Sequence, residues 1–96
     1  MSTPEGRVKE RVKKVLKQHN AYWHMPVQNG MGSPSLDFVV CHRGRFCGIE
    51  TKAGSKRPTP RQETTMRQME EAGGFVLLVN EVEGLNELES WLDGCS

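Results

Sequence analysis

Residue types that could together hydrolyse a phosphodiester occur on two neighbouring apolar segments. Asp37 lies in the segment 36–41, and Glu50 and Lys52 lie at the end of the segment 46–51 and just after it. Two carboxylates held close together repel each other unless a cation lies between them, and hard oxygen ligands suit Mg²⁺ or Mn²⁺. Such an ion would generate hydroxide, and an ammonium would stabilise charge that develops on the phosphoryl oxygens. The combination predicts a metal-dependent site for phosphate chemistry.

The two segments are predicted to be the arms of one β-hairpin. Arg43-Gly44 can form a two-residue turn, so that His42 pairs with Arg45. Counting outward along an antiparallel pair then places Asp37 opposite Glu50, with β-carbons about 5 Å apart. The lysine two residues further along shares their face. A longer turn would shift this register by one, and Arg is unfavourable at positive φ.

A purely structural interpretation of these residues stays open. Asp37 could cap a strand, and Glu50 and Lys52 could form an ordinary ion pair on an exposed sheet face. The motif Glu-x-Lys is weak by itself, so the prediction of a site depends on the rest of the chain.

Length and composition indicate a small soluble protein. The chain has 96 residues, 35% hydrophobic and 26% charged, and we expect one domain over 1–96. No apolar stretch approaches the roughly 20 residues that cross a bilayer, and the N-terminus lacks the apolar core of a signal peptide. We therefore expect an intracellular, cytoplasmic protein without a membrane partner.

Charge is polarised along the chain, although the net charge is only +1. Residues 1–67 hold all thirteen Lys and Arg and five of the twelve acids, a net charge of +8. Residues 68–96 hold the other seven acids and no base, a net charge of −7. A basic segment of this kind is expected where a protein meets a nucleic-acid backbone, and a solvated basic helix is the alternative.

The cysteines Cys41, Cys47 and Cys95 have neither the even count of a disulfide framework nor a C-x-x-C spacing. Cys41 and Cys47 fall in predicted strands, and we interpret them as buried free thiols. A zinc site that adds His24 and His42 is an alternative, although the spacing matches no standard zinc module.

Hydrophobic periodicity predicts elements in the order α-β-β-β-α-β-α. Helices are indicated by apolar residues three and four apart, and strands by short apolar runs between turn residues. We expect an α/β fold with a mixed sheet of about four strands flanked by helices. The predicted helices span about 4–19, 60–71 and 85–92, and the predicted strands 21–27, 36–41, 46–51 and 75–79.

The second helix opens with a capping box. Thr59 is the expected N-cap, Pro60 the first helical residue and Gln62 the side chain that reaches back to the cap. The segment before it, 53–58, is expected to be a flexible basic loop. The Gly- and Pro-rich segment 28–34 cannot sustain regular structure and could pass close to a ligand.

Taken together, these features resemble those of the PD-(D/E)xK nuclease superfamily. The likeness rests on an acidic residue in the first helix, Asp on the second strand, Glu-x-Lys on the third and Gln at the start of the next helix. More narrowly, the chain is similar to the VRR-NUC (virus-type replication-repair nuclease) domain in its compact stand-alone phage form. The similarity covers nearly the whole chain, with its most specific stretches at 4–9, 36–38, 49–53 and 58–62. It departs at Leu36, where the superfamily has a proline that contributes no ligand.

The resemblance implies a restriction-endonuclease-like core and a Mg²⁺- or Mn²⁺-dependent DNA endonuclease without a nucleotide cofactor. Asp37, Glu50 and the carbonyl of Thr51 would be metal ligands, and Lys52 the catalytic lysine. Gln62 matches the glutamine of the family, which would orient the lysine or water or touch the phosphate. That role competes with its role in the helix cap.

Glu5 and Glu10 compete to be the carboxylate of the first helix, and helical phase separates them. Glu5 lies three and seven residues before Val8 and Val12, on the inward face, whereas Glu10 is about 200° from Val8 on the basic outer face. We choose Glu5, whose structural alternative is compensation of the helix dipole. Basic side chains expected to contact DNA are Lys9, Lys13, Lys56, Arg57 and Arg61.

The resemblance also implies a homodimer that cleaves branched DNA such as four-way junctions, because a two-fold dimer carries two sites for symmetric nicks. Trp23, Met25 and Met31 could form the interface or pack in the core, and Trp91 is the expected core anchor of the last helix. The alternative function is a non-catalytic DNA-binding module with a nuclease-like fold. An RNA substrate is less well supported, since no aromatic stacking platform is visible.

Overall fold

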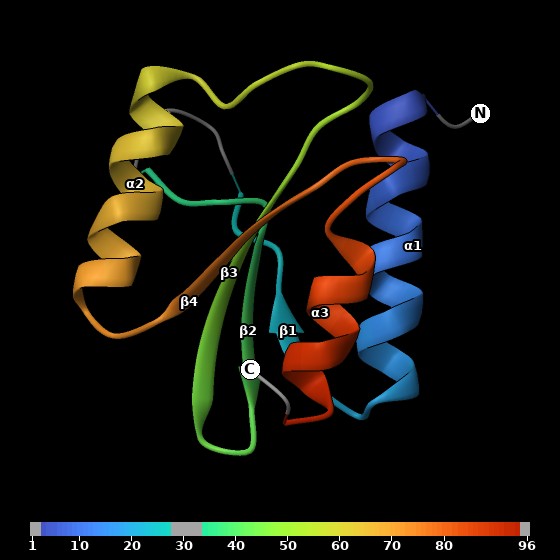
Figure 1. Cartoon of the computed structure of the whole chain (residues 1–96). Helices are drawn as coiled ribbons and strands as arrows, with labels where there is room; N and C mark the ends of the chain where they lie inside the picture. The colour runs from blue at the N-terminus through green and yellow to red at the C-terminus, as the bar shows by residue number, and fades with distance from the viewer. Residues whose placement is uncertain (1–2, 28–33, 95–96) are drawn as a thin grey trace.

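The computed structural model describes residues 3–27 and 34–94, and within them the chain forms three helices and four strands (Figure 1). Their order along the chain is the predicted α-β-β-β-α-β-α. The helices are α1 (Pro4–Gln18), α2 (Pro60–Glu71) and α3 (Leu85–Leu92). The strands are β1 (Tyr22–His24), β2 (Phe38–His42), β3 (Arg45–Thr51) and β4 (Phe75–Val79).

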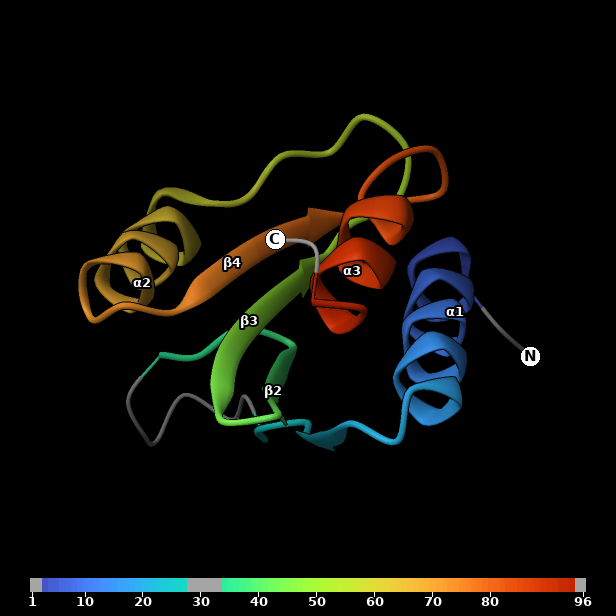
Figure 2. The same cartoon turned by 60° about the horizontal axis from the view of Figure 1, so that its bottom comes forward.

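The described strands form one mixed sheet in the order β1-β2-β3-β4. The first three are antiparallel neighbours, whereas β3 and β4 run parallel and are connected through α2. Figure 2 shows α1 and α3 on one face of the sheet and α2 on the other. The prediction of a mixed sheet flanked by helices is confirmed.

The turn between β2 and β3 has the predicted two-residue geometry. His42 pairs with Arg45, and the turn residues Arg43 and Gly44 have φ values of 53° and 78°. Two successive left-handed residues match the twist of the flanking strands, which explains why the turn forms although Arg is unfavourable there.

This turn fixes the register at the far end of the hairpin. Phe38, the first residue of β2, pairs with Ile49. Asp37 is the residue before that pair and Glu50 the residue after it, so the register sets the two carboxylates beside each other, as predicted.

The core lies between the sheet and the pair α1 and α3. Val8, Val12 and Leu16 of α1 are fully buried, which confirms the predicted inward face. Trp91 is 3% exposed and anchors α3, also as predicted.

Two large apolar residues of β1 and its flank pack inward. Trp23 and Met25 are partly buried against the core, in agreement with the packing alternative for both. Met31 and most of the predicted loop 28–34 lie outside the described residues. No described helix has the length and apolar character needed to cross a membrane.

Two predictions about the strands are wrong. The predicted strand 21–27 is shorter, because only Tyr22–His24 pair with β2, and Pro26 has no N–H to donate to a ladder. Cys41 is exposed rather than buried, since side chains alternate along β2 and its neighbours Val40 and His42 take the buried positions.

Cys47 is buried, as predicted, and burial raises the pKa of its thiol to about 12. A thiol of that pKa stays protonated and inert at neutral pH. Cys95 lies outside the described residues.

Candidate functional site

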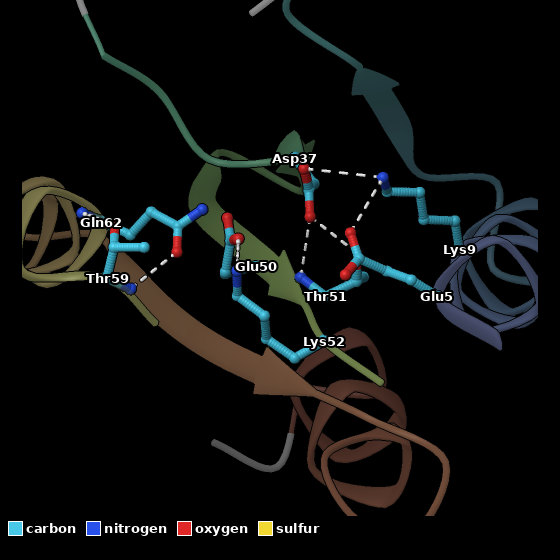
Figure 3. A network of polar contacts seen from close by, with 8 residues as sticks. All are labelled: Glu5, Lys9, Asp37, Glu50, Thr51, Lys52, Thr59 and Gln62. Carbon is cyan, nitrogen blue, oxygen red and sulfur yellow. Dashed lines mark hydrogen bonds and ion pairs between the residues drawn. The ribbon is translucent and has the colours of Figure 1, made fainter. Parts of the chain in front are cut away.

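The C-terminal end of β3 brings the predicted catalytic side chains together (Figure 3). Glu50 belongs to β3, Lys52 directly follows that strand, and Asp37 directly precedes β2. Parallel pairing holds this end in place, because the N–H of Lys52 donates to the carbonyl of Val79 at 3.0 Å. The Lys52 ammonium lies 3.5 Å from Oε2 of Glu50, and its side chain is 14% exposed.

Thr51 fixes the orientation of Asp37. The Thr51 N–H donates to Oδ2 of Asp37 at 2.9 Å, and the Thr51 hydroxyl donates to the same oxygen at 2.7 Å. Oδ1 is left facing α1, where the Lys9 ammonium lies 3.9 Å away. The sequence interpretation gave Thr51 only a carbonyl ligand, so its hydroxyl is a positioning group that was missed.

The carboxylate of Glu50 is in an unfavourable place for a charge. It is 2% exposed, and its Oε1 has no hydrogen-bond partner among the described residues. Burial, followed by the negative charge of Asp37, raises the pKa of Glu50 to about 7, and the Lys52 ammonium offsets only part of this rise. A buried carboxylate without a full set of partners costs stability, and a positively charged partner would reduce that cost.

A hard divalent cation fits this donor set, because the carboxylates of Asp37 and Glu50 are close enough for their charges to interact and Oε1 of Glu50 has no partner within residues 3–27 and 34–94. Across residues 3–27 and 34–94, no three His, Cys, Asp or Glu side chains gather closely enough to hold a metal. The two carboxylates would therefore need oxygen of another kind, such as water or the predicted Thr51 carbonyl. The same finding leaves the zinc alternative without a ligand cluster.

Helix α1 adds Glu5 and Lys9 to the network. The Lys9 ammonium lies 3.4 Å from Oε2 of Glu5 as well as 3.9 Å from Asp37. Glu10 instead pairs with Lys13 at 3.0 Å, and its side chain is 68% exposed. Glu5 thus reaches the site through Lys9, on the side that helical phase predicts, whereas its catalytic role stays a prediction.

Gln62 closes the predicted capping box of α2. Its Oε1 accepts from the Thr59 N–H at 2.9 Å, and its own N–H donates to the Thr59 hydroxyl at 3.2 Å. Figure 3 shows the side chain extending from α2 toward Glu50. The cap uses only the amide oxygen, so the amide nitrogen can serve the site at the same time. The sequence interpretation had treated these two roles as exclusive.

Three of the predicted DNA-binding side chains lie next to the site in sequence. Lys56 and Arg57 are exposed in the loop that leaves β3, and Arg61 is exposed in the first turn of α2. This loop is tied to the segment after β4, where the Glu81 carboxylate accepts from the Gly54 N–H at 2.7 Å. Contact of these side chains, and of Lys9 and Lys13 on α1, with DNA stays a prediction.

Among solved structures, a VRR_NUC domain has the same fold as this chain. The two superpose with a TM-score of 0.72 at 21% sequence identity, over 97% of this chain and 94% of that chain. No protein-family model and no curated protein matches the sequence. The fold of this protein is that of a VRR_NUC domain, as the sequence motifs predicted, with elements in the order α-β-β-β-α-β-α.

Proposed function

We propose that this protein is a Mg²⁺- or Mn²⁺-dependent DNA endonuclease that hydrolyses phosphodiester bonds. The observation that carries the proposal is the buried Glu50 carboxylate beside Asp37 and Lys52, because its Oε1 lacks a partner in the part of the chain that the structure describes. Strongly perturbed carboxylates with a specific charge partner gather at functional sites. The VRR_NUC fold supports the proposal, since the family resemblance implies a nuclease.

Each side chain has a distinct task in this proposal. Asp37, Glu50 and the Thr51 carbonyl would hold the ion, which supplies Lewis acidity and lowers the pKa of bound water. The Thr51 N–H and hydroxyl keep Asp37 oriented. The Lys52 ammonium lies beside Glu50, where it stabilises negative charge on the phosphoryl oxygens. The Gln62 amide nitrogen orients that lysine or the phosphate.

We extend the proposal to branched DNA, such as four-way junctions, cleaved inside the cell by a homodimer. The polarised charge supports a nucleic-acid substrate, and two sites related by a two-fold axis suit paired nicks. A non-catalytic DNA-binding module is the alternative. The carboxylates disfavour it, because negative charge close to a bound phosphate backbone weakens binding and a protein that only binds DNA gains no catalysis in return.

The test is cleavage of a synthetic four-way junction and of linear duplex by wild type and Lys52→Ala, in Mg²⁺, in Mn²⁺ and in EDTA. We expect cutting that disappears in EDTA and falls at least about 100-fold in Lys52→Ala. Lys17→Ala, which removes an exposed lysine from the last turn of α1, is the matched control and should cut like wild type.

The outcomes separate the parts of the proposal. Binding without cutting in either metal would overturn the enzymatic function and favour the binding module. Equal cutting of junction and duplex would overturn the preference for branched DNA and leave the nuclease intact.

A further inference from the structure

The Lys9 ammonium lies at the place where a divalent ion and a lysine would compete for one oxygen. It is 3.9 Å from Oδ1 of Asp37, the carboxylate oxygen that Thr51 leaves free. It is also 3.4 Å from Oε2 of Glu5. Figure 3 shows it joined to both acids by dashed lines.

The contact with Asp37 distinguishes Lys9 from an ordinary surface lysine. Glu–Lys pairs four residues apart are common on helices and contribute little by themselves. Lys13 and Glu10 form a comparable pair three residues apart on the same helix, with side chains 37% and 68% exposed. Lys9 and Asp37 are more protected, at 29% and 16%, and they join α1 to the start of β2.

We propose that Lys9 competes with the divalent cation for Asp37 and thereby sets the metal concentration at which the site fills. In the metal-free protein its ammonium balances the charges of Asp37 and Glu5. A divalent ion on Oδ1 of Asp37 would lie within a few ångströms of the ammonium, and the repulsion between like charges at that distance drives the flexible lysine away. This inference rests on the proposed function for the identity of the cation site.

The opposite role, in which Lys9 positions Asp37 for the metal, is disfavoured by the contacts of Thr51. Two short hydrogen bonds from a fully buried residue already orient Asp37. Lys9 adds only a longer contact from a partly exposed side chain. The two roles predict changes of opposite sign in metal affinity when Lys9 is neutralised.

The test is the dissociation constant for Mn²⁺, measured by titration calorimetry on the metal-free full chain without DNA. Lys9→Met should bind Mn²⁺ about tenfold more tightly than wild type, within the usual range of coupling between two sites. Lys9→Arg keeps the charge and should stay near wild type. Lys13→Met removes the same charge from the same helix outside the network and should also stay near wild type.

Thermal unfolding gives a second measurement on the same variants. Without metal, Lys9→Met should melt below Lys13→Met, because Asp37 and Glu5 lose their counter-cation. With saturating Mn²⁺ the rise in melting temperature should be larger for Lys9→Met. Lys9→Gln replaces Lys9→Met in both measurements if the methionine variant does not fold.

The failures can be told apart. Unchanged or weaker Mn²⁺ binding by the neutral Lys9 variants, in a protein that cleaves DNA with metal, overturns the role of Lys9 alone. Absence of Mn²⁺ binding by wild type overturns both this role and the proposed cation site.

Discussion

The two ends of the β2–β3 hairpin differ in whether their buried and partly buried polar groups have hydrogen-bond partners. At the turn, Nε2 of His42 hydrogen-bonds the carbonyl of Leu92 at 3.1 Å. Arg45 donates to the carbonyl of Trp91 at 2.6 Å and lies 4.5 Å over its ring. At the open end, Glu50 is 2% exposed, yet its Oε1 has no partner among the described residues.

The difference separates polar groups that are paired within the fold from the carboxylate that we propose binds an ion. Partners for His42 and Arg45 come from α3, so these contacts close the fold on itself. The Glu50 carboxylate is left with a raised pKa, and its natural partner would be an ion from outside the chain. Proteins retain such costly groups where chemistry needs them.

The largest expected effect is the loss of cleavage in Asp37→Asn. The amide oxygen can still accept both bonds from Thr51, whereas the negative charge that would hold the ion is gone. We expect kcat to fall by about 100- to 1000-fold, the range for loss of one key electrostatic group, with DNA binding retained. Asp93→Asn, at an exposed acid after α3, should cleave like wild type. Near-normal turnover by Asp37→Asn would remove the distinction between the two ends.

The second prediction concerns the pH dependence of the metal-free protein. The folded pKa of Glu50 is raised from 4.5 to about 7, so folding favours the protonated form. Its contribution to stability is complete below about pH 4.5 and is lost as the pH rises through 7. The loss should be on the order of 3 kcal/mol, following the size of the shift.

Denaturant unfolding between pH 4.5 and 8 checks this prediction. Glu50→Gln carries no titrating group and should show a flatter profile in that window, and Mn²⁺ should stabilise wild type most at pH 8. A wild-type profile as flat as that of Glu50→Gln would show that folding does not raise the pKa of Glu50.

The third prediction tests the turn end. Arg45→Met should lower the free energy of unfolding by about 1–3 kcal/mol, because it removes a hydrogen bond from a charged group and the cation–π contact with Trp91. Its affinity for Mn²⁺ should not change. A change in metal affinity would mean that the two ends are coupled, and the comparison would then fail.

The smallest expected effects come from the cap of α2. Thr59→Ala and Gln62→Ala should each cost about 1 kcal/mol of stability, because both break the capping box. Only Gln62→Ala should also lower kcat, by about tenfold, since its amide nitrogen extends toward Glu50. Equal kcat in the two variants would reduce Gln62 to a cap.

The grouping of Asp37, Glu50 and Lys52 could be predicted from sequence because it depends on local rules. A two-residue turn fixes the register, and the period of two along each strand fixes the face. The bounds of α2, β4 and α3 agree with prediction for a similar reason, since each is a short segment with its own start and stop signals.

Features that depend on distant segments could not be predicted in this way. The exposure of Cys41 follows from which face of β2 the core helices cover. The contact of Lys9 with Asp37 needs α1 to be placed against the start of β2, and no motif in either segment encodes it. The two hydrogen bonds from Thr51 to Asp37 depend on side-chain orientations at the end of the hairpin.

The most direct test of the cation site is anomalous scattering from crystals grown with Mn²⁺. The account predicts an anomalous peak between Asp37 and Glu50, about 2.0–2.6 Å from a carboxylate oxygen of each, as hard divalent ions bind oxygen. Oε1 of Glu50 should be among the ligands. Saturating Mn²⁺ with no peak at these carboxylates, or a peak bound elsewhere on the chain, would contradict it.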